Sequence, residues 1–161
     1  MRKLELKDAN KMMETLNDKS VTSTMRISLR SFSLDECKNY ILNSNKDDKN
    51  IDFAITDESD NWVGTISLKN INYSKKEAEY AIITSKDVHG KGYSQKATKE
   101  ILEYAFNELK LDKVYLYVSV NNIRANKFYQ KVGFIFDRCE KSGLKLGNEY
   151  QDINWYYALR K

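Results

Sequence analysis

The sequence predicts an α/β (α+β) domain with a mixed, mostly antiparallel sheet of seven strands, flanked by about four helices. Three short strand patterns follow one another across residues 51–83 with brief polar turns between them, which indicates an antiparallel meander. A strand, a long helix and another strand across residues 78–120 indicate a parallel crossover. The chain has 161 residues, of which 41% are hydrophobic, so we expect one domain over residues 1–161.

The N-terminal part of the chain predicts one strand and two helices. Leu4-Glu5-Leu6 alternates as a short first strand does, and Asp8 is placed to cap a helix with apolar residues at helical spacing. Residues 17–33 are polar and predict irregular chain. Ser33 and Glu36, three residues apart, form the pattern of a capping box, which starts a second helix.

The remaining elements follow from apolar periodicity and from turn residues. The expected strands are residues 51–55, 62–71, 78–83, 113–120, a strand from 134 onward, and 149–159. The expected helices are residues 95–109 and 123–132. Gly133 stands where a glycine ends a helix. The chain has no proline, so glycine, asparagine, aspartate and serine must form its turns.

Charge and composition narrow the classes of partner. The formal net charge is +4, and lysines are interleaved with acids, which favours a small anionic ligand over nucleic acid. No apolar run reaches the roughly 18–20 residues of a membrane span, and the first residues lack the apolar centre of a signal peptide. Cys37 and Cys139 fit no metal-ligand spacing and predict reduced thiols in a cytoplasmic protein, with a disulfide between them as the alternative. No membrane partner is expected.

A glycine-rich segment, His89-Gly90-Lys91-Gly92-Tyr93-Ser94, connects a predicted strand to the long helix. Two glycines let a backbone approach a ligand closely, and the first amides of a helix have no helical acceptor. This arrangement favours a phosphate or pyrophosphate in front of the helix. The spacing matches neither a P-loop nor a dinucleotide-binding fingerprint, so a simple connecting turn is the alternative interpretation.

A second segment should lie beside this loop. Ligands of open α/β sheets bind at the carboxyl ends of the strands, and the next parallel strand ends near residue 120. Asn122 follows that strand directly, and Tyr129 follows two helical turns later. Asn122 is also a suitable N-cap for the helix 123–132.

Together the two segments resemble the GNAT family of acetyl-CoA-dependent N-acetyltransferases. The pyrophosphate motif of that family, Q/R-x-x-G-x-G/A, is similar to the glycine segment, with His89 in its first position and Ser94 in its last. A second motif, N-x-x-A/S-x-x-x-Y-x-K-x-G-F, is matched by Asn122, Ala125, Tyr129, Lys131, Gly133 and Phe134. The resemblance covers essentially the whole chain and is strongest over residues 62–134.

The resemblance implies a GNAT-like sheet that splays between strands 78–83 and 113–120 to admit the pantetheine arm of acetyl-CoA. The arm would pair with the strand backbone as another strand does and would receive a hydrogen bond from Asn122. The pyrophosphate would lie in the glycine loop, and no metal is implied. The cofactor-binding residues are then Ile82, Ile83, Thr84, His89, Gly90, Lys91, Gly92, Tyr93, Ser94 and Asn122.

Within the family, the chain looks most like the spermidine N-acetyltransferases and the enzymes that acetylate the N-terminal residue of ribosomal proteins. It departs from the spermidine branch where the acceptor should bind. Residues 24–32 contain Arg26 and Arg30 but no carboxylate, and Ser67 and Asn70 stand where that branch tends to carry acids. These departures argue against a polyamine. The two arginines either receive an anionic group of the acceptor or are ordinary surface charges.

Transfer of an acetyl group to an amine needs a base for the amine and an acid for the leaving thiolate. Tyr129 is the candidate acid, because a phenol with a pKa of about 10 keeps its proton at pH 7; ordinary aromatic packing is the alternative. Glu79 is the candidate base, because it shares a strand face with Ala81 and Ile83 and should be partly buried. The alternative for Glu79 is a carboxylate that faces solvent.

The sequence therefore predicts an acetyl-CoA-dependent N-acetyltransferase in which a primary amine attacks the thioester directly. The acceptor would be a small amine, an amino sugar or a peptide N-terminus, and nucleic acid is not expected as a partner. A non-catalytic module that senses acetyl-CoA is the alternative function. The final strands are expected to be exposed, so a homodimer could form by pairing them.

Overall fold

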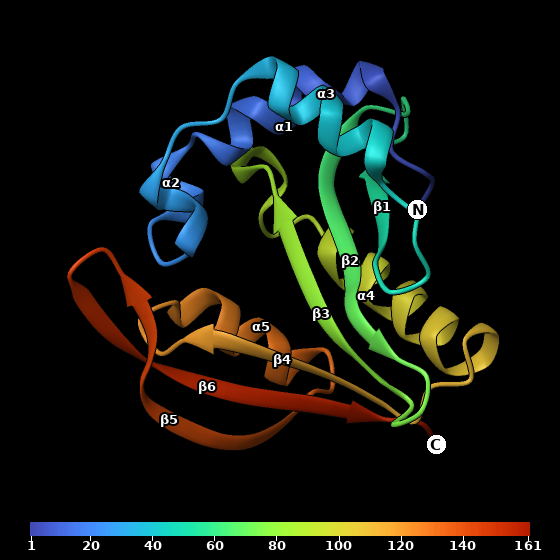
Figure 1. Ribbon diagram of the computed structural model, residues 1–161, viewed down its shortest axis with the longest axis vertical. Coiled ribbons are helices and arrows are strands. Elements are labelled where there is room, and N and C mark those ends of the chain that lie inside the picture. The colour runs from blue at the N-terminus through green and yellow to red at the C-terminus, as the bar shows by residue number, and fades with distance from the viewer.

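A six-stranded mixed sheet forms the centre of the structure, a computed structural model that describes residues 1–161. The strand order is β1-β2-β3-β4-β6-β5 (Figure 1). The strands are β1 (Ile51–Thr56), β2 (Trp62–Asn72), β3 (Glu77–Thr84), β4 (Lys113–Ser119), β5 (Ile135–Leu146) and β6 (Glu149–Leu159). The α-helices are α1 (Ala9–Leu16), α2 (Lys19–Thr22), α3 (Leu34–Asn43), α4 (Tyr93–Glu103) and α5 (Ile123–Lys131). None of the helices is both long enough and apolar enough to cross a membrane.

Strands β3 and β4 are joined over a short seam. β1, β2 and β3 form the predicted antiparallel meander, and β3 lies parallel to β4, as the crossover predicts. The pairing covers Glu77–Glu79 of β3 and Lys113–Tyr115 of β4 and then stops, although β3 continues to Thr84 and β4 to Ser119. The two strands diverge beyond that point (Figure 1), so the predicted splay is confirmed.

The first predicted strand is wrong, and the sheet has six strands rather than seven. At Leu4–Leu6 the chain makes no strand; a single bridge from Arg2 to β1 is followed by a 3-10 turn. The Asp8 carboxylate accepts hydrogen bonds from the Glu5 amide at 2.8 Å and from the Arg2 guanidinium at 2.9 Å, which closes the chain into this turn. Asp8 is the N-cap residue of α1, as predicted, but its side chain makes no capping bond there.

A fifth helix, α2, lies in the segment that the sequence predicts to be irregular. The Asp18 carboxylate caps it by accepting a hydrogen bond from the Ser20 amide at 3.0 Å. A single helical turn is too short to give a periodic pattern, which explains why four helices are expected and five are found. The capping box of α3 is confirmed, because the Ser33 hydroxyl accepts from the Glu36 amide at 3.1 Å.

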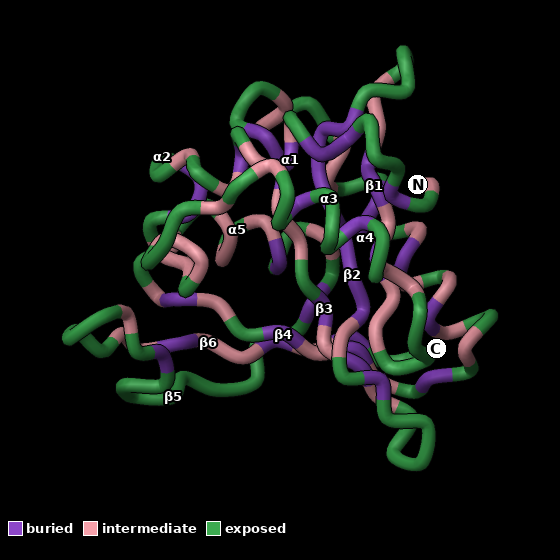
Figure 2. Tube along the Cα trace, turned by 45° about the horizontal axis from the view of Figure 1, so that its top comes forward, coloured by how far each residue is buried: buried purple, intermediate pink, exposed green.

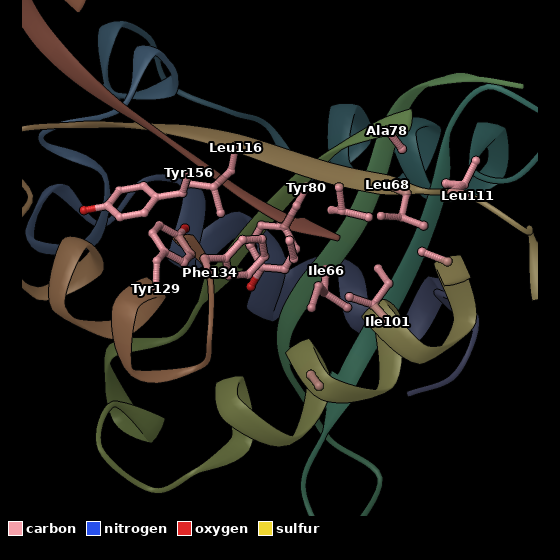
Figure 3. Packing of buried hydrophobic residues seen from close by; sticks show 14 of the residues in the cluster. Ile66, Leu68, Ala78, Tyr80, Ile101, Leu111, Leu116, Tyr129, Phe134 and Tyr156 are labelled. Atoms are coloured by element: carbon pink, nitrogen blue, oxygen red, sulfur yellow. The ribbon is translucent and has the colours of Figure 1, made fainter. Parts of the chain in front are cut away.

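Two hydrophobic clusters lie on opposite faces of the sheet. On β1, Ala54 belongs to one cluster and its neighbour Ile55 to the other, since successive residues of a strand face opposite sides. The larger cluster packs α4 and α5 against β2, β3, β4 and β6, and Figure 3 shows side chains within it. The smaller cluster packs α1 and α3 over β1 and β2 and includes Cys37. Both cysteines are free, and Cys139 is exposed on β5.

The face covered by α1 and α3 is left partly open over β4 and β6. Figure 2 shows β2 buried along most of its length, whereas β5 is exposed along nearly all of its length. No residue of β4, β5 or β6 belongs to the smaller cluster. Tyr115, Tyr117 and Trp155 therefore form a partly exposed aromatic surface there, with the Trp155 ring 5.3 Å from Tyr117 and 6.2 Å from Tyr115.

Candidate functional site

The free edge of β3 forms one wall of the splay. Because β4 pairs with β3 only as far as Glu79, the edge of β3 that faces β4 has no partner strand over residues 80–84. The other edge remains paired with β2 through Thr84. An extended ligand can bond to such a free edge as an added strand does. The predicted residues Ile82, Ile83 and Thr84 all lie on this stretch, half-buried or buried.

The glycine loop follows the splayed end of β3. Gly90 and Gly92 have φ angles of 80° and 86°, in the left-handed region that favours glycine. Gly92 is the N-cap residue of α4, so this helix starts at Tyr93, two residues earlier than predicted. Its first helical hydrogen bond is donated by the Lys96 amide to the Gly92 carbonyl. The three amides before Lys96 have no helical acceptor. Those donors and the helix dipole favour an anion in front of α4.

His89 adds an unpaired side-chain nitrogen to this loop. Its Nε2 atom is buried and has no hydrogen-bond partner in the protein. Burial, together with the positive charge of Arg124, lowers the pKa of the His89 imidazole below its ordinary value. The imidazole is therefore neutral at pH 7. Arg124 lies at the start of α5. An anion bound between the glycine loop and this end of α5 would give the His89 imidazole and the Arg124 guanidinium a common partner.

The other loop residues contribute mainly through their backbone. The Tyr93 hydroxyl donates to Glu58 at 2.8 Å, which directs this side chain toward the turn between β1 and β2. The Ser94 carbonyl accepts from the Thr98 hydroxyl at 2.7 Å inside α4. Lys91 is exposed on the loop. Of this set, the amides of Tyr93 and Ser94 are left for an anion, and so are the Ser94 hydroxyl and the Lys91 ammonium, which bond to nothing else in the protein.

Asn122 caps α5, and it keeps a free donor. Its Oδ1 atom accepts from the Ala125 amide at 3.1 Å, while its Nδ2 group makes no hydrogen bond within the protein. The two roles predicted for Asn122 are therefore compatible, since capping uses only the oxygen. The start of α5 is held further by Asn126, which donates to the carbonyls of Ser119 and Asn122 at 3.0 and 2.8 Å.

Tyr129 is held under the sheet by the way α5 ends. Gly133, at φ 97°, donates to the Gln130 carbonyl at 3.3 Å, and Phe134 donates to the Tyr129 carbonyl at 3.0 Å. This bond pattern is a Schellman motif, so Gly133 is the helix-ending glycine that the sequence predicts. The motif brings Phe134 back onto Tyr129, with ring centroids 5.8 Å apart (Figure 3).

The Tyr129 hydroxyl is free, although the side chain is buried. The ring contacts Tyr80 and Tyr156 as well as Phe134, with centroids 5.8 and 5.9 Å away, but the hydroxyl makes no hydrogen bond within the protein. Burial raises the pKa of the Tyr129 phenol, so it keeps its proton at neutral pH. Tyr129 therefore packs in the core, as the alternative interpretation expects. Its hydroxyl is also available as a donor, and its role as the acid stays a prediction.

Glu79 lies where the pairing of β3 and β4 ends. It is the last residue of β3 in register with β4, opposite Tyr115, and it is half-buried. Its carboxylate accepts one hydrogen bond, from the Asn70 side chain at 3.0 Å, and forms no ion pair. Burial and the charge of Glu79 raise the pKa of both Tyr115 and Tyr117, so these phenols remain neutral beside it. An unpaired carboxylate at the point where two strands diverge is suited to accept a proton.

The two arginines predicted to bind the acceptor have different surroundings in the structure. Arg30 donates to Glu36 at 2.6 Å, and its guanidinium stacks over Phe32 at 4.1 Å, which is the bonding of a surface arginine. Arg26 is exposed at the start of a 3-10 turn that follows α2. Its charge opposes the upward shift of the Tyr117 pKa, which puts Arg26 near the open aromatic surface.

A buried polar cluster that the sequence does not predict lies on the same face of the sheet as Glu79. Asp52 is 3% exposed, and one of its oxygens accepts from Ser67, Tyr40 and Lys69 at 2.6, 2.6 and 2.7 Å. The only sequence signal is a charged residue in a strand whose other members are mostly apolar. No three or more histidine, cysteine or carboxylate side chains converge as metal ligands would.

Comparison with known proteins places these features in a family. Residues 1–135 match the family described as the acetyltransferase (GNAT) domain. A spermidine N(1)-acetyltransferase of Vibrio cholerae is 32% identical over 108 residues, which cover 67% of this chain and 62% of that protein. A putative ribosomal N-acetyltransferase of Bacillus subtilis is 29% identical over 98 residues, which cover 61% of this chain and 54% of that protein. The chain thus spans less than two thirds of the length of these curated relatives.

Solved structures extend the likeness over nearly the whole chain. The crystal structure of the Vibrio cholerae spermidine N-acetyltransferase in complex with CoA and spermine aligns with a TM-score of 0.85 and 28% identity, covering 98% of this chain and 93% of that one. A dodecameric structure of the Vibrio cholerae enzyme aligns with a TM-score of 0.79 and 29% identity, covering 98% and 91%. With its splayed sheet and its glycine loop before α4, the chain belongs to the GNAT family of acetyltransferases, which use acetyl-CoA.

Proposed function

We propose that this protein is an acetyl-CoA-dependent N-acetyltransferase that acts on a primary amine. The observation that carries this proposal is the set of groups that lie along the splay between β3 and β4. The splay between β3 and β4 has free backbone donors at the start of α4, an unpaired carboxylate at Glu79 and a free, protonated hydroxyl at Tyr129. Backbone donors can bind the pyrophosphate of a thioester such as acetyl-CoA. A carboxylate and a protonated hydroxyl can serve as the base and the acid for transfer of its acyl group.

The residues that would hold acetyl-CoA lie at the free edge of β3, in the glycine loop and at the N-terminal ends of α4 and α5. The amides of Tyr93 and Ser94 and the orphaned Nε2 atom of His89 would bind the pyrophosphate. The unpaired edge of β3 over residues 82–84 would bond to the pantetheine arm, and the free Nδ2 group of Asn122 would donate to the same arm. The bound molecule would supply the activated acetyl group as a thioester.

Two side chains would move the protons of the reaction. Glu79 would take a proton from the acceptor ammonium, directly or through a water, which leaves a lone pair for attack on the thioester carbon. As the new C–N bond forms and the C–S bond breaks, Tyr129 would give its proton to the sulfur of CoA. The second proton lost by the nitrogen would pass, directly or through water, to the Tyr129 oxygen and restore the phenol. Because burial raises the pKa of the Tyr129 phenol, the proton is present on its oxygen at neutral pH when the thiolate leaves.

The acceptor would be a small amine, an amino sugar or a peptide N-terminus. The structural relative that holds CoA and spermine supports a small amine. The open aromatic surface beside Glu79 supports an acceptor with an ammonium group, because aromatic faces and a carboxylate both attract cations. A long polycation is less favoured, because the positive charge of Arg26 acts on Tyr117 of the same surface and would oppose a second cation there.

The test is thiol release from acetyl-CoA in the presence of four classes of amine: a polyamine, an amino sugar, an arylalkylamine and short peptides with free N-termini. We expect turnover with at least one class. The Glu79→Gln variant should lose most of that turnover while it still binds acetyl-CoA, because the amide cannot accept the proton. Binding of acetyl-CoA by the native protein without turnover on any class would instead identify a sensor of acetyl-CoA.

We further propose that copies of the protein associate through their edge strands in the cytoplasm. β5 forms the edge of the sheet, and its Ile135 and Phe136 are each 50% exposed. An exposed apolar edge is a template for pairing with another chain, and a related structure is dodecameric. The two free cysteines suit a reducing compartment. Sedimentation should show a species larger than a monomer, which Ile135→Lys should shift toward the monomer.

A further inference from the structure

The buried Asp52 carboxylate binds the ammonium of Lys69, which would otherwise pair with Glu79. Lys69 and Glu79 are direct cross-strand partners in the β2–β3 register. Directly opposed residues of an antiparallel pair have Cβ atoms about 4.5–5.5 Å apart, on the same face of the sheet. Opposite charges at such positions normally pair. Here they do not, because the Lys69 ammonium donates to Asp52 at 2.7 Å and to Tyr40 at 2.9 Å.

The preference of Lys69 for Asp52 has a physical cause. The Asp52 side chain is 4% exposed, and a buried carboxylate without a cation is strongly unfavourable. Burial works against the charged form of Lys69, but its hydrogen bonds to Asp52 and Tyr40 outweigh this effect and raise the pKa of the ammonium. Lys69 therefore stays charged and stays on Asp52. Glu79 is half-buried and more solvated, so it competes poorly for the same cation.

Glu79 is instead held by a neutral donor. Asn70 has φ 51° at an irregularity in the β2–β3 register, between Lys69 and Asn72, and its Nδ2 group reaches Glu79 at 3.0 Å. Asn70 fixes the orientation of the carboxylate without neutralising its charge. The second oxygen of Glu79 has no partner in the protein. The carboxylate is thus oriented, without an ion pair and open on one oxygen where β3 and β4 diverge.

We propose that Asp52 is a positioning residue for acetyl transfer: by holding the Lys69 ammonium, it keeps Glu79 free for the amine of the acceptor. Asp52 touches neither substrate in this arrangement and acts only through Lys69. The proposal rests on the proposed function, and in particular on Glu79 as the group that meets the acceptor ammonium. A lysine bonded to Glu79 would neutralise the base and occupy the place of the acceptor's own cation.

The main test is Asp52→Asn, alone and combined with Lys69→Met. An asparagine oxygen can still accept from Ser67 and Tyr40, but it releases the charge of Lys69 toward Glu79. We expect kcat/KM for the amine to fall about tenfold or more in Asp52→Asn, while KM for acetyl-CoA stays the same. Adding Lys69→Met should restore kcat/KM to within about threefold of native, because the misplaced cation is gone. A merely structural role for Asp52 predicts no such rescue.

A second variant tests the same idea without touching the buried cluster. Asn70 is exposed, and Asn70→Lys places a cation directly on the Glu79 carboxylate while Asp52, Tyr40 and Lys69 stay as they are. It should lower kcat/KM for the amine by a similar factor. Asn70→Gln, which keeps a neutral amide, is the matched control and should lose much less. This variant keeps the test decisive if Asp52→Asn does not fold, as judged by circular dichroism.

Three outcomes would overturn the proposal. They are native kcat/KM in Asp52→Asn, no recovery when Lys69→Met is added to a folded Asp52→Asn protein, and native kcat/KM in Asn70→Lys. Failure of the proposed function looks different, because the native protein would then turn over no amine at all. If the native protein is active and Glu79→Gln is equally active, the role of Glu79 fails first, and that of Asp52 fails with it.

Discussion

Tyr129 differs from the other buried tyrosines in what its hydroxyl does. The buried tyrosines are Tyr80, Tyr129 and Tyr156. The Tyr80 hydroxyl bonds to Thr98 at 2.8 Å, and the Tyr156 hydroxyl donates to Asn126 at 2.8 Å. The Tyr129 hydroxyl makes no hydrogen bond within the protein, although its ring is buried, so it is the one hydroxyl of the three that is free to meet a ligand.

We expect Tyr129→Phe to lower kcat by about 10²–10⁴-fold at saturating substrates while KM for acetyl-CoA changes little. The phenylalanine ring keeps the contacts with Tyr80 and Phe134, and no hydrogen bond is lost, so thermal stability should be native. Tyr80→Phe is the matched control: it loses its bond to Thr98 and some stability but should keep kcat. Native kcat in Tyr129→Phe, measured by thiol release, would rule out Tyr129 as the acid.

His89 makes binding of acetyl-CoA sensitive to pH. Its pKa in the free protein is lowered by burial and by Arg124, below the value of about 6.5 in the unfolded chain. The unfolded chain therefore binds more protons, and this contribution to stability is full above pH 6.5 and is lost as pH falls through the lowered folded pKa. A pyrophosphate beside Nε2 favours the imidazolium, so binding should take up a proton in this range.

Calorimetry near pH 6 tests this expectation. The heat of acetyl-CoA binding to the native protein should depend on the ionisation heat of the buffer, because a proton is taken up. In His89→Gln, which retains a polar side chain that cannot titrate, this dependence should disappear. An equal buffer dependence in both proteins would show that the proton binds elsewhere.

Among the elements, those fixed by local chemistry could be predicted, and those fixed by distant partners could not. The ends of α5 are readable because Asn122 caps its own helix and Gly133 supplies a left-handed residue. The turn near Leu4 is not readable, because it depends on where Arg2 meets Asp8 and β1. Alternation alone describes a strand and a turn of that length equally well.

The candidate site likewise contains residues that could be predicted from local sequence and residues that could not. Tyr129 and the glycine loop belong to short motifs and are found from spacing. The bond between Asp52 and Lys69 joins residues 17 apart on different strands, so only the register of β1, β2 and β3 reveals it. Arg26 and Arg30 are four apart in the sequence, yet Phe32 and Glu36 hold only one of them.

The start of α4 can be tested through its backbone. Gly92→Ala forces a side chain into the left-handed region at the N-cap, at a cost of roughly 1–2 kcal/mol. We expect this variant to raise KM for acetyl-CoA several-fold, with a smaller effect on kcat, because the amides before Lys96 shift. Gly147→Ala is the matched control, since Gly147 has φ 63° in the β5–β6 turn. It should lose similar stability and leave KM native.

At the scale of the whole molecule, the seam of β3 and β4 couples two halves of the sheet. β1–β3 lie on one side of it and β4–β6 on the other, and only Glu77–Glu79 and Lys113–Tyr115 pair across it. A ligand that bonds to both walls of the splay adds the connections that the strands lack. Acetyl-CoA should therefore stabilise the fold as well as bind to it.

At 100 times its Kd, acetyl-CoA should add about 2.7 kcal/mol to the free energy of unfolding and raise Tm by roughly 5 °C or more. Hydrogen exchange should slow most in peptides that cover residues 80–84 and 93–95, where free amides become bonded. Peptides from β5 serve as the internal control and should exchange at the same rate with and without ligand. Protection spread evenly over the chain would contradict binding in the splay.

The same short seam affects how the chain folds. The β1–β3 meander and the β5–β6 hairpin join neighbouring segments, whereas the seam joins Glu77 to Lys113, across an intervening loop and helix. Closing a long loop costs entropy, and three residue pairs return little for it. We therefore expect the seam to form late, so that Ala78→Gly accelerates unfolding more than it slows refolding. The opening that admits a ligand in the native state would then be the first place where the protein comes apart.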